Sequence, residues 1–365
     1  KQATAAEAET FAAEERKLVE IARAFYQLPE LFIVDETTTA LPQKGRNILY
    51  RLIRELKEAG KAVIFISHDI DELMQVCNCV TILRDGKYIA TLNEDEMDAK
   101  KMKSLMVGRE VVDNFYRSDY DKVPENAEVA LKVENVNSGI LQDISFELHK
   151  GEILGLAGLS DCGIHDIGKT VFGLNRIDGG SVEVPGHGRI TSAHKAIKAG
   201  MGFMSKNRDT ESMLITLSIQ ENVVLPSLGN LQKLGFFVTP KSEHDLADQW
   251  CTKLNVKMRG LNQACSELSG GNKQKIVLAK WLGNNSNIFI LDCPTRGIDI
   301  GVKDTIYRIM EDLRSQGKAI IMISEELPEV LGMSDRILVM KDGRIVKSFD
   351  RSPQLAESDI IEYMI

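Results

Sequence analysis

The stretch LSGGNKQKIVLAKWL, residues 268–282, decides the fold of this 365-residue chain. Two adjacent glycines stand directly before a run in which apolar residues recur at helical spacing. Small residues at a helix start leave its first backbone N–H groups accessible, and these groups together with the helix dipole favour a phosphate. The alternative is a plain loop that leads into a helix. The pattern predicts a helix preceded by a candidate phosphate site at Leu268, Ser269, Gly270, Gly271 and Asn272.

A second copy of this pattern lies earlier in the chain. ERKLVEIARAFYQLPELFIVDETTTAL resembles NKQKIVLAKWLGNNSNIFILDCPTRGI without a gap, and the likeness continues through AVIFIS and AIIMIS. The offset is 257 residues between Asp35 and Asp292 and again between Gly60 and Gly317. A fixed offset over so long a stretch indicates duplication of a whole domain and not a short solenoid repeat.

The repeat also predicts the domain boundaries. The second copy begins near Ala127, where LKVENV and ISFEL alternate as strands do, so its first-copy counterpart would fall about 130 residues before Lys1. We expect an incomplete first domain over residues 1–108, a polar linker over 109–126 and a second domain over 127–365. Short apolar strands alternate with amphipathic helices in each copy, which predicts an α/β fold with a mainly parallel sheet.

Each copy carries an aspartate at the end of an apolar strand. In phosphate-handling folds such a residue, here Asp35 or Asp292, holds Mg²⁺ directly or through water. The next residue is Glu36 in the first copy, where a carboxylate can polarise a water, but Cys293 in the second.

The following strand leads to His68 in the first copy and to Glu325 in the second. A lone histidine is usually a satisfied surface or core imidazole. At this spacing behind an Asp-Glu pair, His68 is instead a candidate catalytic residue together with Glu36.

These motifs together resemble those of ABC ATPases. LSGGN, LDCPTRGID and ISEELPEVLGMSDRI are similar to the second half of the fused double ATPases of ribose, galactose and xylose importers. EIARA, VDETTTAL, FISHD and MVGRE are similar to the end of their first half. The resemblance covers nearly the whole chain and implies a P-loop ABC-ATPase fold in two duplicated halves, with ATP and Mg²⁺ as cofactors. It implies that Glu36 polarises the attacking water, His68 contacts the γ-phosphate and Asp35 organises the metal.

The phosphate loop of the second half is ambiguous in register. GIHDIGKT formally matches the phosphate-loop pattern, but a helix that starts at Lys169 would have barely one turn. The register that fits both the strand EILGLA and the family pattern begins at Gly158 and reaches the helix after Gly163. Lys169 would then lie inside the helix and face solvent.

In this register the second half departs from the family. Ile164 stands in place of the phosphate-binding Lys, His165 in place of the Mg²⁺-binding Ser or Thr, and Asp161 adds negative charge to the loop. Farther along, Lys206 replaces a family glutamate. We expect the second half to bind nucleotide weakly, if at all, by its own loop.

The resemblance further implies that the halves pack head-to-tail, with each nucleotide between the phosphate loop of one half and the LSGGN-type loop of the other. In one composite site every element present is intact: Asp35, Glu36, His68 and the LSGGN loop. In the other every element is altered: the loop at Ile164, Asp292, Cys293, Glu325 and residues 12–15.

Composition limits the remaining choices. The chain is 27% charged and 43% hydrophobic, with a net charge of -8, so free nucleic acid is excluded as the main ligand. No apolar run approaches the roughly 18 residues of a membrane helix. The six cysteines lack paired CxxC spacing and indicate reduced thiols.

The sequence therefore predicts a subunit that binds and hydrolyses ATP to energise a bacterial ABC importer for a monosaccharide or similar small polar solute. We expect transmembrane permease subunits as partners, a solute-binding protein as an indirect partner, and a peripheral position on the cytoplasmic face of the inner membrane. Without the first phosphate loop, the chain alone is expected to hydrolyse ATP poorly or not at all.

Two alternatives remain open. One is a catalytically silent ABC-fold scaffold or regulatory subunit, which Ile164, Cys293 and Glu325 favour. The other is a non-transport ABC ATPase, which would be expected to carry coiled-coil, zinc-binding or strongly basic insertions, and the sequence shows none of these.

Overall fold

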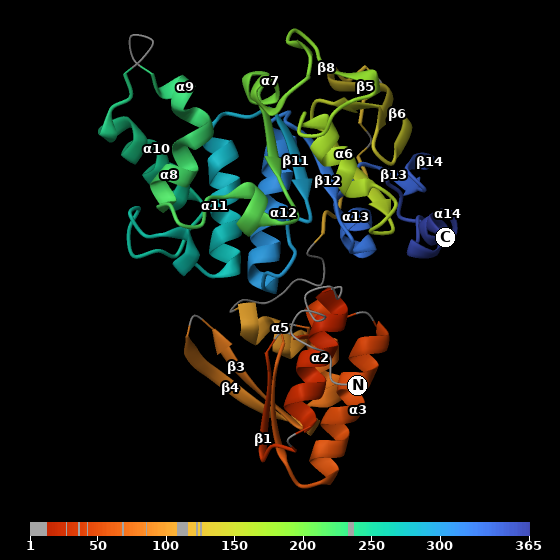
Figure 1. The fold of residues 1–365 in the computed structure, drawn as a ribbon, viewed down its shortest axis with the longest axis vertical. Helices are drawn as coiled ribbons and strands as arrows, with labels where there is room; N and C mark the ends of the chain where they lie inside the picture. The colour runs from red at the N-terminus through yellow and green to blue at the C-terminus, as the bar shows by residue number, and fades with distance from the viewer. Residues whose placement is uncertain are drawn as a thin grey trace. The chain divides into compact units, whose positions relative to one another are not determined.

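The computed structural model describes residues 13–26, 28–35, 37–41, 43–67, 69–84, 86–107, 116–121, 123–124, 126–232 and 237–365. The chain divides into two compact units, each of which is described by itself (Figure 1). Unit 1 is Lys1–Asp113 with Asp299–Gly301, and unit 2 is Asn114–Ile298 with Val302–Ile365.

Unit 2 is built on a six-stranded sheet of order β10-β11-β12-β7-β13-β14 (Figure 1). All neighbours in this sheet are parallel except β13 and β14, so the predicted α/β fold with a mainly parallel sheet is confirmed. Its strands are β7 Ile153–Gly158, β10 Met201–Met204, β11 Ile288–Asp292, β12 Ala319–Ile323, β13 Arg336–Lys341 and β14 Arg344–Asp350.

A second sheet of unit 2 is antiparallel, with order β6-β5-β8-β9. Its strands are β5 Val129–Ser138, β6 Leu141–His149, β8 Gly179–Val184 and β9 Gly188–Arg189. The helices of unit 2 are α6 Ile164–Val171, α7 Ala193–Lys198, α8 Ile219–Val224, α9 Leu228–Leu231, α10 Pro240–Lys253, α11 Gly270–Gly283, α12 Ile300–Ser315, α13 Leu327–Met333 and α14 Glu357–Met364.

Unit 1 repeats the elements of unit 2 from α11 onward. It contains α2 Ala13–Tyr26, β1 Leu31–Asp35, α3 Gln43–Glu58, β2 Ala62–Ile66, α4 Ile70–Val76, β3 Cys79–Arg84, β4 Lys87–Asn93 and α5 Ala99–Val107. Every α-helix and β-strand from α2 to β4 has the same bounds as its counterpart from α11 to β14 when 257 is added. Gly60 and Gly317, which end the paired helices, have φ of +73° and +77°, the left-handed conformation that glycine adopts at least cost. The predicted duplication is confirmed.

A buried carboxylate is repeated with the same partners. Glu329 accepts hydrogen bonds from the hydroxyls of Thr295, Tyr307 and Ser324. In unit 1 the aligned Glu72 accepts from the hydroxyls at the three aligned positions, Thr38, Tyr50 and Ser67. Buried polar groups are costly unless they are hydrogen-bonded, so each cluster ties the segments that follow two adjacent strands to two helices.

The strands of unit 1 have fewer neighbouring strands than their counterparts in unit 2. In unit 2, β7 lies between β12 and β13 and pairs with both. In the described part of unit 1, the counterparts β2 and β3 belong to separate two-stranded sheets, β1-β2 and β3-β4. A groove of about 620 Å³ lies between them and is lined by both strands. The groove therefore has the place that β7 fills in unit 2.

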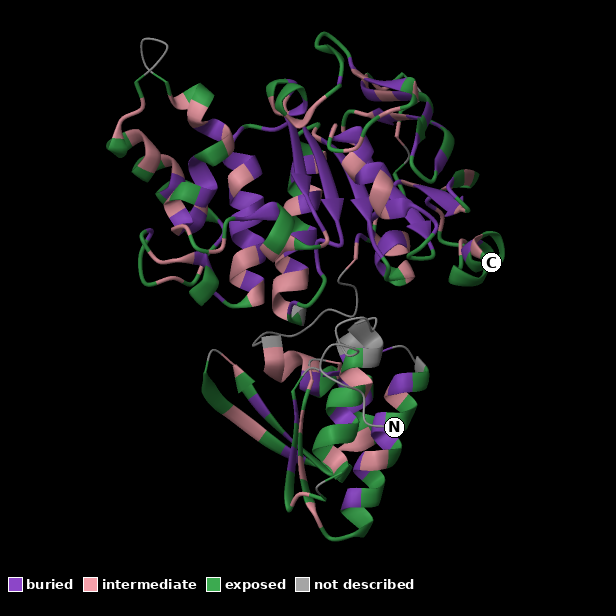
Figure 2. Cartoon of the chain, in the orientation of Figure 1, coloured by how far each residue is buried: buried purple, intermediate pink, exposed green. Residues whose placement is uncertain are grey.

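The burial of the two sheets differs accordingly (Figure 2). Ile64 and Ile66 on β2 are 48% and 45% exposed, whereas the aligned Ile321 and Ile323 on β12 are fully buried. The same kind of apolar strand thus has a neighbouring strand on both sides in unit 2, whereas in the described part of unit 1 it has a neighbour, β1, on one side only.

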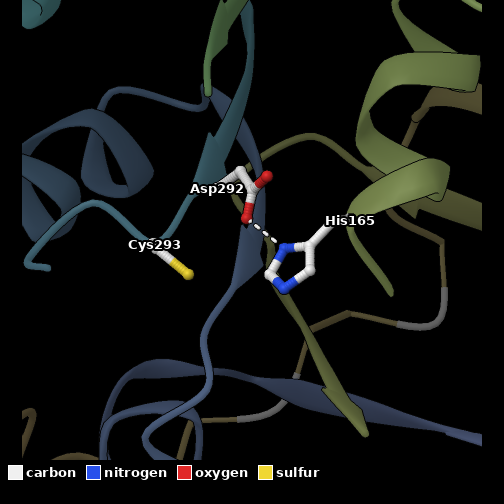
Figure 3. Close-up of side chains that lie close together, drawn as sticks. All are labelled: His165, Asp292 and Cys293. Atoms are coloured by element: carbon white, nitrogen blue, oxygen red, sulfur yellow. Dashed lines mark hydrogen bonds and ion pairs between the residues drawn. The ribbon is translucent and has the colours of Figure 1, made fainter. Parts of the chain in front are cut away.

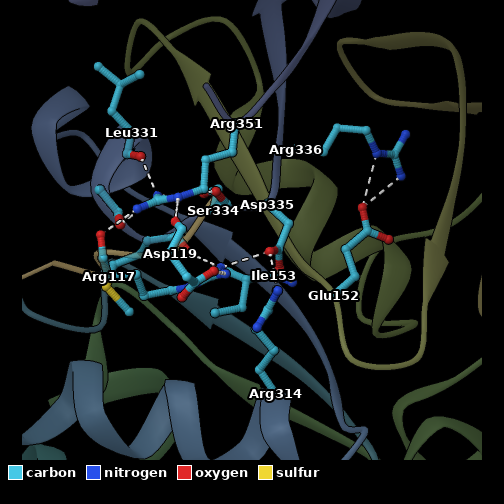
Figure 4. Close-up of polar contacts among 12 residues, drawn as sticks. Arg117, Asp119, Glu152, Ile153, Arg314, Leu331, Ser334, Asp335, Arg336 and Arg351 are labelled. Atoms are coloured by element: carbon cyan, nitrogen blue, oxygen red, sulfur yellow. Dashed lines mark hydrogen bonds and ion pairs between the residues drawn. The ribbon is translucent and has the colours of Figure 1, made fainter. Parts of the chain in front are cut away.

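Part of the segment that the sequence predicts as linker is fixed on unit 2. Arg117 is buried and donates to Asp335, which also accepts from Arg314 (Figure 4). Arg351 donates to the Arg117 carbonyl oxygen. A charge that is buried in this way is tolerated because it is paired and hydrogen-bonded, so residues 116–121 belong structurally to unit 2.

Candidate functional site

The loop between β7 and α6 fixes the phosphate-loop register. β7 ends at Gly158, Gly163 adopts φ +96° as the residue before the helix, and α6 begins at Ile164. A Cβ on Gly158 would meet Cys162 and approach the Met340 carbonyl oxygen to 2.9 Å, so this position requires glycine. The helix start is the one predicted, and the GIHDIGKT register, in which the helix would start at Lys169, is excluded because Lys169 lies in the last turn of α6.

The sequence predicted that Lys169 faces solvent, but the side chain is paired with a carboxylate. Its ammonium lies 3.0 Å from the Glu211 carboxylate, and 30% of the side chain is exposed. Glu211 also accepts from Ser205, so Lys169 helps to hold the segment that follows β10.

The altered loop residue His165 contacts the aspartate at the end of β11. His165 Nδ1 lies 2.7 Å from Asp292 Oδ1 (Figure 3). Asp292 is 1% exposed. Among the described residues, no donor lies within hydrogen-bonding distance of its second oxygen, Oδ2. The register therefore brings two sequence-predicted positions together, and it leaves half of a buried carboxylate unpartnered.

Lys206 and Glu325 complete an ionic network around His165. Lys206 Nζ lies 2.6 Å from Glu325 Oε1 and 3.4 Å from His165 Nε2. Glu325 Oε1 also accepts from Ser160 at 2.7 Å and lies 3.5 Å from His165 Nε2. Two cationic groups and two carboxylates are thus paired at the mouth of the phosphate loop.

The network changes the protonation of its members. Burial lowers the pKa of His165, but hydrogen bonds to Asp292 and Glu325 outweigh it and raise the pKa to about 9. The hydrogen bond from His165, together with Lys206 and Ser160, lowers the pKa of Glu325 well below its usual range despite burial. The imidazole is therefore a cation at neutral pH, and Glu325 is an anion.

The residues of this site are poorly suited to binding Mg²⁺ and a nucleoside triphosphate. Ile164, at the position of the phosphate-binding lysine, is apolar and fully buried. His165 replaces a hydroxyl with a group that is already engaged by Asp292. Mg²⁺ prefers oxygen ligands in near-octahedral geometry, and the Glu325 carboxylate would repel a phosphate placed beside it.

The LSGGN loop forms the N-terminus of α11. Ser269 is the residue before the helix, Leu268 is buried, and Asn272 Nδ2 donates to Ser269 Oγ at 2.9 Å. The side-chain oxygen of Asn272 accepts from Lys257 N at 2.8 Å. This geometry presents the first-turn amides that the sequence predicted as a phosphate site.

Packing restricts substitution at both glycines of this loop, most strictly at Gly271. A Cβ on Gly271 would come within 2.9 Å of Val302, and one on Gly270 within 2.7 Å of Arg208 Nη2. The Arg208 guanidinium donates to Gln274 and to the Arg296 carbonyl oxygen. Since Arg208 and Lys206 share one segment, residues 205–212 connect the start of α11 with the His165 network.

The first-half candidates are described only in part. Asp35 ends β1 and is exposed. Glu36 and His68 lie outside the described residues, as do the side chains of residues 12–15.

Sequence reasoning noted Lys206 and Glu325 separately and missed that they form a pair. A usable signal was present. At Lys206 a family glutamate has become a cation, and at Glu325 the histidine of the first half has become an anion. Opposite charges at two altered positions make contact between them electrostatically favourable.

The chain is similar to known proteins of ABC transporters. The family described as "ABC transporter" matches residues 141–296. A Geobacillus kaustophilus protein with the provisional name ribose/galactose/methyl galactoside import ATP-binding protein is 40% identical over 357 residues, or 95% of this chain and 70% of its own length. The ribose import ATP-binding protein RbsA of Bacillus subtilis is 38% identical over 91% of this chain and 66% of its own length.

Solved structures agree in fold. The dimeric structure of MJ0796, a bacterial ABC transporter cassette, aligns with a TM-score of 0.54 at 18% identity over 61% of this chain and 99% of its own. A nucleotide-free ATP-binding cassette from an ABC transporter aligns with a TM-score of 0.54 at 20% identity, covering 65% of this chain and 99% of its own. The chain spans about two thirds of the length of the curated relatives.

Proposed function

The chain belongs to the ABC transporter family of ATP-binding, ATP-hydrolysing proteins, and from this premise we propose that it energises the import of ribose, galactose or a similar small polar solute. The names of the relatives support this solute class. Transmembrane permease subunits are the direct partners in the proposal, and a solute-binding protein is an indirect one.

The proposed position is peripheral, on the cytoplasmic face of the membrane. Within the part of the chain that the structure describes, no helix combines the length and the apolar character needed to cross a membrane. In the proposal the permease supplies the membrane path for the solute.

In this proposal ATP is hydrolysed at one composite site and not at two. The observation that carries it is the ionic network in unit 2, where His165 and Lys206 are paired with Asp292 and Glu325. These pairs occupy the polar groups with which a nucleotide site would engage Mg²⁺ and the γ-phosphate. We assign unit 2's own loop a structural role.

The competent site would combine first-half residues with the second-half LSGGN loop. Asp35 would organise Mg²⁺, Glu36 would polarise the attacking water, and His68 would contact the γ-phosphate. The amides of Ser269, Gly270 and Gly271 would stabilise the phosphate charge from the opposite half. A phosphate loop carried on a strand equivalent to β7 would complete this site, and the groove between β2 and β3 supports its place.

A matched pair of substitutions tests the composite site. Ser269→Glu adds an anion at an exposed residue whose substitution avoids the packing constraints of the two glycines. Ala12→Glu makes the same change at the aligned position of the first half. In the full-length protein assembled with its permease, we expect Ser269→Glu to reduce ATP turnover by at least about 100-fold and Ala12→Glu to leave it within about twofold. Equal loss in both variants would contradict one-site hydrolysis.

The second candidate function is a catalytically silent scaffold, which the same ionic network favours. Glu36→Gln distinguishes the two. If the chain hydrolyses ATP in the assembled transporter, this substitution abolishes turnover while nucleotide binding remains. A scaffold would show no turnover attributable to the chain before or after the substitution.

A further inference from the structure

Three different metal-ligating side chains meet in unit 2. One ligand atom each from His165, Asp292 and Cys293 lies within 4.8 Å of the other two (Figure 3). A nitrogen, an oxygen and a sulfur form a softer donor set than the all-oxygen set that Mg²⁺ prefers. Asp292 matches the aspartate of the first copy, whereas Cys293 stands where the first copy has Glu36. His165, from the loop before α6, stands where the family resemblance implies a Ser or Thr.

The buried carboxylate carries the strongest sign of a ligand. Asp292 is 1% exposed, its Oδ1 engages His165, and within the described ranges Oδ2 has no hydrogen-bond donor. A buried carboxylate oxygen without a partner is costly, and native structures rarely tolerate one without a ligand, ion or water.

Cys293 is held in a strained conformation that fixes its position. Its φ is +51°, in the left-handed region that non-glycine residues seldom occupy. Its N–H donates to the Ile323 carbonyl oxygen at 2.8 Å, and its own carbonyl oxygen accepts from Arg296 N at 3.2 Å. The backbone on both sides thus holds the buried Cys293 beside Asp292.

The outer nitrogen of His165 has the partner that a ligating histidine needs. Its Nε2 faces the Lys206–Glu325 pair, 3.4 Å from Lys206 Nζ and 3.5 Å from Glu325 Oε1. A metal-bound histidine commonly donates its other ring N–H to a carboxylate, which fixes the tautomer and the ring orientation. Lys206, the nearby cation, is neutralised by Glu325 at 2.6 Å. Glu325 would therefore act as a positioning residue.

We propose that His165 Nδ1, the Asp292 carboxylate and Cys293 Sγ bind one transition-metal ion of the Zn²⁺ class, with water in the fourth position. Zn²⁺ accepts nitrogen, carboxylate oxygen and thiolate sulfur in a tetrahedral site. On binding, the proton between Nδ1 and Asp292 and the Cys293 thiol proton leave to solvent, and no redox change occurs. The site rests on unit 2 alone and does not depend on which half hydrolyses ATP.

Cobalt titration of the intact chain after chelator treatment tests the site, since Co²⁺ reports thiolate ligation by a charge-transfer band. The chain also holds a CxC pair, Cys77 and Cys79, in unit 1, so the reference protein carries Cys77→Ser and Cys79→Ser. We expect this protein to bind one Co²⁺ per chain with the band, Zn²⁺ to displace it and excess Mg²⁺ not to do so. Absence of the band, or displacement by Mg²⁺, would overturn the proposal.

Substitutions in the reference protein identify the ligands. We expect Cys293→Ser to remove the band and His165→Asn to weaken Co²⁺ binding at least about tenfold. His165→Asn provides an independent test if Cys293→Ser fails to fold. A band that survives Cys293→Ser, or unchanged affinity in His165→Asn, would refute the site. Glu325→Gln should keep the band and weaken binding by about 10- to 100-fold, whereas unchanged affinity would refute its positioning role.

Discussion

In each unit one buried glutamate, Glu329 or Glu72, accepts hydrogen bonds from three hydroxyl groups. Glu329 is fully buried, and burial raises its pKa although three hydroxyls donate to it. The loop residues Thr295 and Ser324 and the helical Tyr307 all depend on this acceptor. The repeat of the same cluster around Glu72 indicates that it belongs to the architecture and not to the altered site.

Glu329→Ala should therefore destabilise unit 2 strongly. It leaves three hydroxyl donors without their acceptor in a buried place, at roughly 1–3 kcal/mol each. We expect a loss of about 4 kcal/mol in the free energy of unfolding, measured by urea denaturation. A loss below about 1 kcal/mol would show that the cluster is not needed.

Lys280 carries a charge that the fold disfavours. Burial lowers its pKa to about 8, from an ordinary value of 10.5, and its ammonium donates to the Ser212 carbonyl oxygen at 3.1 Å. Because the folded-state pKa lies below the unfolded one, protonation destabilises the native state below pH 8. That cost fades as the pH rises from 8 to 10.5.

Lys280→Met should remove this cost. We expect the variant to gain about 2 kcal/mol in the free energy of unfolding at pH 7 and almost nothing at pH 10.5. Urea denaturation at the two pH values measures both. An equal effect at both pH values, or destabilisation at pH 7, would contradict the burial cost assigned to this ammonium.

At the scale of elements, the equivalent strands β2 and β12 of the two copies show how neighbouring strands determine the burial of a strand. Their sequences, AVIFI and AIIMI, have similar apolar character, yet only β12 lies between two parallel strands. In the described part of unit 1, β2 pairs with β1 alone. Burial here follows the completeness of the sheet and not the strand sequence.

Amide hydrogen exchange should separate these two strands. Backbone amides of residues 62–66 should exchange at least about tenfold faster than those of residues 319–323, because open strand edges exchange through local opening. Mass spectrometry of peptides covering both ranges gives the comparison. Equal protection would mean that the groove between β2 and β3 is not an open strand position.

The sequence predicted the positions of helices and strands along the chain better than the order of the strands in the sheet. The 257-residue offset and the apolar periodicity predicted the helices and strands that the two units share, because these signals are local. They did not show that β7 lies between β12 and β13, since strand order depends on contacts far apart in the chain. The Lys206–Glu325 pair was missed for the same reason, because 119 residues separate its members.

At the scale of the whole molecule, the two copies have diverged by chemistry while keeping the fold. Unit 2 has a six-stranded sheet and, where its loop meets α6, an ionic network of His165 and Lys206 with Asp292 and Glu325. The first-half motif keeps Asp35, Glu36 and His68. This divergence supports a protein in which one half contributes catalytic residues and the other contributes the LSGGN loop.

The most direct measurement is the number of nucleotides trapped per polypeptide by the Glu36→Gln variant of the full-length protein, assembled with its permease in the presence of Mg²⁺ and ATP. One-site hydrolysis predicts a single ATP per polypeptide, held at the composite site with the LSGGN loop, and no turnover. Two trapped nucleotides per polypeptide would contradict the assignment of unit 2's own loop to a structural role.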